Sequence, residues 1–376
     1  MMITSVYISR LFDRFDYSLE LCKGLTFIHS PNGYGKSTLM HLIYSALKGD
    51  TKYMEEIPFE RLDIGFDDDS VLIIEKEEGR LLIQMQKNEL ETEISPQEAS
   101  DVCDVIYVPP ERLAVRRRDG HIAPALDTYA QELYERVRYS KEHSELVPYT
   151  GARREMSDGE LEFWSKDLKA KLDFIKDAGF EPDIPAGYRF PPSRYELLNY
   201  RKDYEDLAYS ISEYVDKNYI LAESIVIFKD IVNDIFIGKT LDVSENGKMT
   251  VVLDGGSALQ LNRLSSGEKQ IIIMLYNLLF HAEPGSVAII DEPEISLHIT
   301  WQQRLGSIFS DICRVRGVQI IAATHSPQVI HDLWDDAREL KPENARPDIL
   351  LRRLQRGHDD PHPLQGGVHP RGRGHR

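Results

Sequence analysis

Hydrophobic and polar positions at the start of the chain follow the patterns of short strands and one helix. The apolar side chains of residues 3–28 alternate or cluster as three strands, in the order strand, turn, strand, strand. The third strand ends at a glycine-rich turn, after which the apolar side chains of residues 37–47 recur on one helical face up to Gly49. A strand, a glycine-rich loop and a helix therefore follow one another here.

Strand patterns continue to about residue 108. Residues 57–94 predict several strands joined at two turns, residues 67–69 and residues 78–79. Residues 105–108 form a short apolar run that two prolines end, because proline cannot donate a hydrogen bond to a sheet. We expect these strands to form a β-rich lobe.

The pattern changes to charged, aromatic and helical between residues 113 and 222. Residues 160–176 and 195–215 are the clearest predicted helices, and four prolines between them interrupt the helical pattern. No heptad repeat is sustained in this part of the chain. We therefore expect a compact helical arm rather than a long coiled coil.

Sheet and helix patterns return in the last third of the chain. Residues 225–237 predict an amphipathic helix, residues 240–253 a hairpin and residues 266–280 a buried helix. Residues 286–290 and 318–323 are continuous apolar runs of the kind that a parallel sheet buries on both faces. The helical pattern between these two runs supplies the crossover that parallel strands need.

These patterns predict an α/β protein with a β-rich lobe and a mainly parallel sheet flanked by helices. The expected segments are a first head segment over residues 1–112, a helical insertion over 113–222, a second head segment over 223–340 and a disordered tail over 341–376. The tail has almost nothing apolar to bury. A basic nucleic-acid-binding tail and a His-rich metal site are alternatives to the preferred interpretation, an unselected end.

Charge and cysteine content limit the expected binding partners and cellular location of the protein. The net charge of −17 disfavours a broad basic face for DNA, so any nucleic-acid contact must be local, for example at the arginines of residues 116–118 or 153–154. Solvated surface charge is the commoner reason for such patches. Three widely spaced cysteines and no signal-peptide pattern favour a cytoplasmic location. The longest apolar run, residues 271–280, is shorter than the roughly 20 residues of a membrane helix, so we expect no membrane contact.

Residues 30–38, Ser-Pro-Asn-Gly-Tyr-Gly-Lys-Ser-Thr, carry the strongest chemical signal. Small residues let backbone N–H groups surround a phosphate at a helix N-terminus. Lys36 is expected to reach the β- and γ-phosphates of ATP, and Ser37 to bind Mg²⁺. Ser30 replaces the first glycine of the usual pattern, and a glycine turn with a solvated lysine is the competing interpretation. The residues expected to bind nucleotide are Ser30, Asn32, Gly33, Gly35, Lys36, Ser37 and Thr38.

Two adjacent acids, Asp291 and Glu292, follow the apolar run at residues 286–290. At the end of a buried strand, Asp291 is expected to hold the Mg²⁺ shell and Glu292 to orient or deprotonate the attacking water. An acidic surface turn is the alternative for this pair taken alone. Together with the phosphate loop, the pair favours a core that hydrolyses ATP with Mg²⁺.

Two further motifs resemble those of ABC-type ATPases. Residues 264–270, Leu-Ser-Ser-Gly-Glu-Lys-Gln, resemble the signature motif, and residues 323–327, Ala-Thr-His-Ser-Pro, resemble the segment of the switch histidine. The resemblance implies a head-to-head dimer in which Ser266 and Gly267 of one copy face the γ-phosphate held by the other. It also implies that His325 contacts the γ-phosphate or the attacking water, although an isolated histidine is more often structural.

Within this superfamily, residues 291–298 resemble the branch that contains SMC, RecF and OLD-like proteins. The resemblance implies the ATPase subunit of a bacterial anti-phage or DNA-maintenance system, PARIS- or OLD-like, that answers to DNA or a phage protein and controls a separate effector such as a nuclease. About fifty residues after His325 are too few for a Toprim nuclease domain. The glutamine that normally follows the strand before the insertion has no obvious counterpart, because Glu111 or Arg112 stands in its place.

Three function classes remain in view: an ATP-gated switch, a transporter subunit and a P-loop kinase. A kinase has no need of a signature-like motif, and a transporter subunit would not usually contain an insertion of about a hundred residues. The switch is therefore the preferred hypothesis. The nucleotide-binding subunit of an ABC transporter is the alternative.

Overall fold

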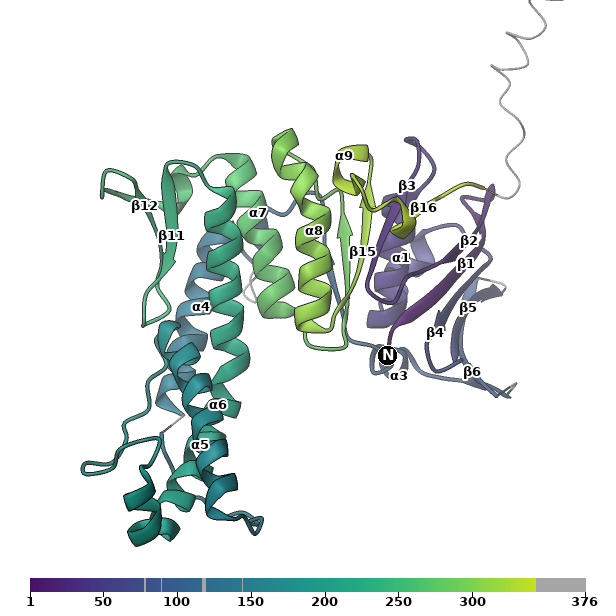
Figure 1. The fold of residues 1–376 in the computed structure, drawn as a ribbon. Helices are drawn as coiled ribbons and strands as arrows, with labels where there is room; N and C mark the ends of the chain where they lie inside the picture. Colours follow the sequence, from purple (N-terminus) through teal and green to yellow (C-terminus); the bar gives the residue numbers. More distant parts are fainter. Residues whose placement is uncertain (78, 89, 117–119, 144, 343–376) are drawn as a thin grey trace, which may run out of the picture.

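The computed structural model describes residues 1–77, 79–88, 90–116, 120–143 and 145–342. The predicted disordered tail lies outside the described residues from position 343 onward, as does most of the arginine run at residues 116–118. Figure 1 shows a head across the top of the view and a helical arm that extends below it. The arm is formed by the chain between two segments of the head.

A parallel five-stranded sheet forms the centre of the head, in the order β16-β3-β15-β14-β8. Its strands are β3 (Leu25–His29), β8 (Val105–Val108), β14 (Val287–Asp291), β15 (Gln319–Thr324) and β16 (Ala337–Glu339). All neighbouring pairs are parallel, so β3, β15 and β14 end at the same edge of the sheet. The predicted buried strands and the α/β fold class are confirmed.

Different elements cover the two faces of this sheet. Side chains alternate along a strand, so Ala288 and Ile290 join one apolar core while Val287 and Ile289 join the other. Helices on the first face are α7 (Ser266–Tyr276) and α8 (Ile299–Arg316), and the helix on the second face is α1 (Lys36–Lys48). The strands β3, β14 and β15 are buried on both faces, as their apolar runs predict, whereas the edge strand β16 is partly exposed.

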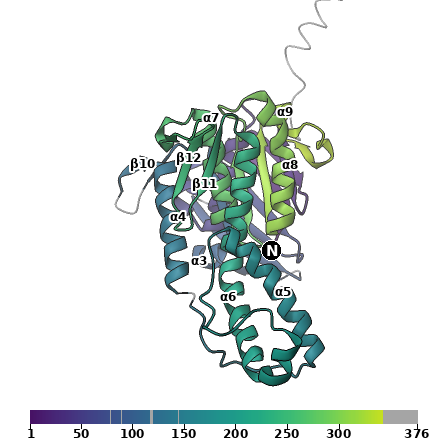
Figure 2. The ribbon, with the colours of Figure 1, turned by 60° about the vertical axis from the view of Figure 1, so that its left-hand side comes forward.

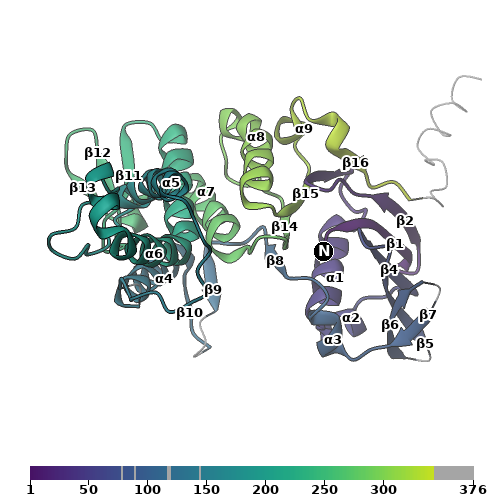
Figure 3. The same cartoon turned by 60° about the horizontal axis from the view of Figure 1, so that its bottom comes forward.

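A six-stranded antiparallel sheet forms the predicted β-rich lobe, in the order β2-β1-β4-β5-β6-β7. Its strands are β1 (Ile3–Leu11), β2 (Phe15–Glu20), β4 (Arg61–Phe66), β5 (Val71–Glu77), β6 (Arg80–Lys87) and β7 (Leu90–Glu93). Two short helices, α2 (Thr51–Glu56) and α3 (Pro96–Ser100), lie beside α1. Figure 3 shows α1 between this sheet and the parallel sheet, and its apolar side chains pack against both.

The arm contains α4 (Ala125–Glu142), α5 (Asp158–Asp177) and the first part of α6 (Arg194–Ile235). The helix α5 packs along α6, and the four prolines lie in the segment between these two helices (Figure 2). Among the described residues the arm is therefore a short helical bundle and not a long coiled coil, as expected.

The prediction of two separate helices over residues 195–215 and 225–237 is wrong, because α6 continues without interruption from residue 201 to Ile235 and its kink lies at Tyr200. The segment between the two predicted helices contains neither glycine nor proline. Its polar side chains find partners within the helix: Asn218 Nδ2, for example, donates to Tyr214 O at 2.8 Å. Nothing in this segment therefore ends the helix.

The helix α6 joins the arm to the head. It has a kink at Tyr200, after which residues 201–235 continue as one helix of about 50 Å at the usual rise. The C-terminal part packs against α7 and a small sheet of the head. The predicted boundary at residue 222 thus falls inside one helix that runs from the arm into the head.

Smaller elements complete the described chain. They are β9 (Ala114–Arg116), β10 (Ile122–Pro124), the sheet of β11 (Lys239–Val243), β12 (Met249–Leu253) and β13 (Ala258–Leu259), two 3₁₀ turns (Leu261–Arg263 and Trp334–Asp336), a π-helical turn (Asn277–His281) and α9 (Pro327–Ile330). The predicted hairpin over residues 240–253 is confirmed as β11 and β12. Among the described helices, none combines the length and the apolar character that crossing a membrane requires.

Candidate functional site

The glycine-rich loop joins β3 to α1 at the carboxyl edge of the parallel sheet. Gly35 lies at the N-cap of α1 with φ of 80°, a backbone conformation that residues other than glycine rarely adopt. A Cβ atom at this position would lie 3.0 Å from Phe12 Cε2 and 3.2 Å from Leu11 Cδ2. The loop therefore needs glycine for its backbone shape and for its close packing against β1. Its backbone N–H groups open at a helix N-terminus.

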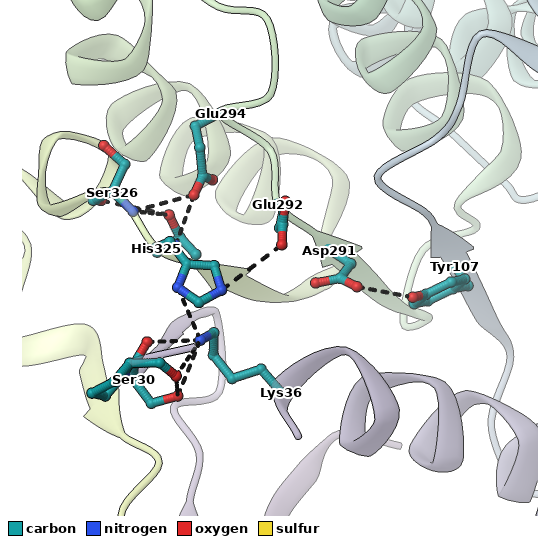
Figure 4. A network of polar contacts seen from close by, with 10 residues as sticks. Ser30, Lys36, Tyr107, Asp291, Glu292, Glu294, His325 and Ser326 are labelled. Carbon is teal, nitrogen blue, oxygen red and sulfur yellow. Dashed lines mark hydrogen bonds and ion pairs between the residues drawn. The ribbon is translucent and has the colours of Figure 1, made fainter. Parts of the chain in front are cut away.

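Lys36 is the first residue of α1, directly after this loop, and is almost fully buried. Its Nζ donates to Ser30 O at 2.7 Å and to Ser30 Oγ at 3.0 Å. Burial lowers the pKa of Lys36, and the nearby carboxylates of Glu292, Asp291 and Glu294 oppose that change. The serine in the place of the usual first glycine thus has a contact of its own with the lysine (Figure 4).

Asp291 ends β14 and is 1% exposed. Its Oδ2 accepts a hydrogen bond from the Tyr107 hydroxyl at 3.3 Å, whereas Oδ1 has no partner of hydrogen-bonding geometry among the described residues. Burial raises the pKa of Asp291, and the hydroxyls of Ser37 and Tyr107 oppose that rise.

An unpartnered buried carboxylate oxygen beside a serine hydroxyl is a donor set that suits Mg²⁺. Ser37 Oγ and Asp291 Oδ1 are the atoms that would hold the ion. A bound Mg²⁺ would neutralise negative charge on the terminal phosphates.

Tyr107→Phe is expected to raise the Mg²⁺ concentration that gives half-maximal ATP hydrolysis by about tenfold, because a partner that orients a metal-binding carboxylate is lost. Burial raises the pKa of Tyr107, so its hydroxyl stays a neutral donor toward Asp291. The measurement is a Mg²⁺ titration at saturating ATP. Tyr44→Phe is the matched control, because the Tyr44 ring packs 5.4 Å from the Tyr107 ring in the same aromatic cluster. Equal Mg²⁺ requirements in the two variants would contradict the role of Tyr107.

The side chains of Glu292 and His325 face each other beside the glycine-rich loop. His325 Nε2 lies 3.8 Å from Glu292 Oε1, and His325 Nδ1 lies 3.2 Å from Lys36 Nζ. Because the ammonium group can only donate, Nδ1 is the acceptor and Nε2 carries the proton toward Glu292. Figure 4 shows these side chains converging from β14, β15 and the loop after β3. A lysine, a histidine and a carboxylate thus meet where a terminal phosphate and an attacking water would lie.

A pocket of about 440 Å³ brings most of the predicted residues together. The predicted residues that line it are Asn32, Gly33, Gly35, Lys36, Ser37, Thr38, Glu292 and His325. Ser30 and Asp291 lie directly beside it through their contacts with Lys36 and Ser37. The sequence analysis missed two aromatic lining residues, Phe12 and Tyr34. No signal in the sequence pointed to Phe12, because its exposed position in the turn after β1 becomes visible only in the structure.

Ser266 and Gly267 do not line this pocket. They begin α7, on the far side of α8 from α1 (Figure 1), and Ser266 is exposed. A Cβ atom on Gly267 would lie 2.5 Å from Ser296 O, so glycine is required for this close approach of two backbones. Ser265 and Glu268 form a capping box, and Glu268 pairs with Lys239 at 2.6 Å. The signature-like turn is therefore built rigidly but lies away from the phosphate loop of its own chain.

Several solved head domains are similar to this chain at low sequence identity. They include the Smc head domain with an extended coiled coil bound to the C-terminal domain of ScpA from Pyrococcus furiosus, with 15% identity, coverage of 91% of this chain and 94% of that chain, and a TM-score of 0.47. The SMC head domain from Thermotoga maritima has 13% identity, coverage of 90% and 92%, and a TM-score of 0.45. No curated protein sequence matched. The fold assignment rests on the sheet topology described above and not on these likenesses.

A family of nucleotide-binding domains matches most of the chain. The match covers residues 31–331, from the phosphate loop to the segment just beyond His325. It therefore includes both halves of the site and the arm between them. The chain belongs to the family described as "AAA domain, putative AbiEii toxin, Type IV TA system".

Proposed function

We propose that this chain is an ATP-hydrolysing switch that dimerises head to head and controls a separate effector, such as a nuclease, in a bacterial defence or DNA-maintenance complex. The ATPase part is supported by the convergence of Lys36, Glu292 and His325 on one pocket, beside a buried Asp291 with a free oxygen. The family description, which mentions a toxin and a Type IV TA system, supports a defence role.

Completion of the site by a second copy is the property that would distinguish a switch from a simple ATPase. The exposed turn at Ser266 is shaped by a capping box and by the close contact of Gly267, yet it faces none of the pocket residues of its own chain. A helix N-terminus stabilises a phosphate only within about its first turn. Ser266 therefore acts on nucleotide only when it belongs to another copy.

Mixing two inactive variants tests this arrangement. Lys36→Met removes the cation of the phosphate loop, and Ser266→Arg blocks the signature-like turn, so each variant alone is expected to be inactive. In a mixed dimer one site pairs the intact loop of one chain with the intact turn of the other. Equal mixing should restore about a quarter of wild-type turnover, because half of the dimers are mixed and each has one intact site. The measurement is steady-state ATP hydrolysis across mixing ratios.

Two outcomes would contradict the proposal. Full activity of Ser266→Arg alone would show that the turn takes no part in the site. An inactive mixture that forms mixed dimers, verified by differently tagged chains, would show that the two copies do not complete each other. Recovery of no effector or DNA with a trapped ATP-bound dimer would count against the defence or DNA-maintenance role, whereas recovery of a membrane protein would favour a transporter subunit.

A further inference from the structure

Arg112 is a buried cation that lies behind residues 291–293, the segment that contains Asp291 and Glu292. It is 3% exposed and follows β8 by four residues. Its NH1 donates to Pro109 O at 3.2 Å and, less closely, to Asp291 O at 3.5 Å. Its NH2 donates to Pro293 O at 3.1 Å and to Glu292 O at 3.5 Å. One guanidinium group thus contacts three successive carbonyls of the segment that carries the predicted metal ligand Asp291 and the predicted catalytic acid Glu292.

The backbone of that segment has a conformation that needs external support. Glu292 has φ of 48°, in the left-handed region that costs a residue with a side chain free energy. Its N–H donates to Ala323 O at 2.9 Å, on β15, while its carbonyl faces Arg112. The peptide groups on both sides of Glu292 are therefore held, and the direction of its side chain toward His325 follows from this backbone.

Glu294 holds the turn that carries His325. Its Oε1 accepts hydrogen bonds from the backbone N–H groups of His325, at 2.7 Å, and of Ser326, at 3.2 Å. Figure 4 shows Glu294 above His325, with its carboxylate on that turn. The turn that carries the histidine is thereby joined to the segment that carries Glu292.

The two residues complement each other in charge. Burial lowers the pKa of Arg112 to about 10, and Glu294 provides the largest opposing charge, ahead of Asp291 and Glu292. Arg112 Nε and Glu294 Oε2 are both buried and without a hydrogen-bond partner among the described residues. Among the described residues Arg112 forms no ion pair, and a buried cation without a close anionic partner is costly, so its hydrogen bonds to backbone carbonyls point to a positional role.

We propose that Arg112 and Glu294 are positioning residues for ATP hydrolysis, which together fix the backbone on both sides of Glu292 and the turn of His325. This inference rests on the proposed ATPase function. Neither residue lines the pocket, so neither is expected to contact a bound nucleotide. Arg112 also stands at the start of the chain that leads through β9 and β10 to α4, so the root of the arm is attached to the catalytic segment.

The experiment compares kcat and KM for ATP in Arg112→Met and Arg112→Lys. Methionine keeps an unbranched side chain but no donors, and we expect kcat to fall about 100-fold, as for a small misplacement of catalytic groups. KM for ATP should stay within about threefold, because no contact to the nucleotide is removed. Lysine should recover part of kcat, since it restores a buried cation but not the planar fork. Arg314→Met, at an exposed position on α8, is the control and should leave both parameters unchanged.

Glu294 gives an independent pair of variants. Gln can accept the same two backbone hydrogen bonds through its amide oxygen, whereas Ala cannot. We expect kcat of Glu294→Gln to stay within about threefold of wild type and kcat of Glu294→Ala to fall about tenfold. Wild-type kcat in both Arg112→Met and Glu294→Ala would overturn the inference, as would a rise in KM equal to the loss in kcat/KM.

Hydrogen exchange separates this inference from the proposed function. In the nucleotide-free protein, Arg112→Met should speed amide exchange in residues 289–296 and 323–327, with exchange in the antiparallel lobe unchanged. Faster exchange at these two segments in the variant, with no ATP turnover in wild type, would support the positioning role of Arg112 but overturn the ATPase function. Normal turnover and unchanged exchange in the variant would overturn the positioning role alone. If Arg112→Met fails to fold, Arg112→Lys and Glu294→Ala carry the same comparison.

Discussion

Glu292→Gln is expected to bind ATP with near wild-type affinity and to hydrolyse it at least about 100-fold more slowly, since it loses a general base. The Glu292 carboxylate lines the pocket with Lys36 and lies 3.8 Å from His325. Glutamine preserves the size of the side chain but neither attracts nor accepts the proton of an attacking water. The barrier should rise by about 2.7 kcal/mol or more. ATP then stays intact, and the ATP-bound dimer should accumulate.

Single-turnover hydrolysis and the mass in solution, with and without ATP, Mg²⁺ and DNA, measure these two effects. Glu91→Gln is the matched control, because Glu91 is exposed on β7 in the antiparallel lobe. A Glu292→Gln protein that remains monomeric in ATP and still hydrolyses it would remove both the role of Glu292 and the head-to-head dimer.

Lys36→Met is expected to weaken ATP binding about 100-fold, through the loss of charge-assisted hydrogen bonds to the phosphates. The ammonium group is the single side-chain cation within the lining of the pocket, apart from any charge on His325. Methionine fills a similar volume, so the loop should keep its packing against Leu11 and Phe12. ATP hydrolysis should fall with the loss of binding.

Binding of a fluorescent ATP analogue and the thermal midpoint test this prediction together. Some loss of stability is expected, because Ser30 O and Ser30 Oγ lose the donor that they share. Lys52→Met, at an exposed position on α2, controls for the removal of a lysine. Unchanged nucleotide affinity in a folded Lys36→Met protein would contradict the assignment of the phosphate loop.

The site joins segments that are far apart in the chain because the central sheet is parallel. Parallel strands end at one edge, and β3, β14 and β15 are adjacent in it. The loop after β3, the acids at the end of β14 and the histidine after β15 therefore meet at one edge, where contacts such as that of His325 Nδ1 with Lys36 Nζ join them.

Local patterns predicted most elements of the head. The runs that became β3, β14 and β15 are continuous and apolar, and glycine marks the loop before α1. These signals are local, because strand burial and turn geometry depend on a few neighbouring residues. The candidate residues of the loop and of the acidic pair could be named for the same reason.

The arm shows where local patterns were insufficient. The two predicted helices proved to be continuous with each other, because the segment between them contains neither glycine nor proline to end the helix. The contact between Arg112 and the carbonyls of residues 291–293 spans about 180 positions along the chain, and no spacing rule predicts it. The sequence alone marks Arg112 only as one of two residues that stand in the place of the glutamine expected after the strand.

The sequence by itself determined the order of strands and helices, the phosphate loop and the acidic pair, since each depends on periodicity and residue chemistry over about ten positions. Only the tertiary structure decided which strands are neighbours, how Tyr107 holds Asp291, and how Arg112 supports Glu292. It also decided that the turn at Ser266 lies away from the pocket. These features depend on the packing of distant segments around shared cores, and packing is a property of the whole chain rather than of any local pattern.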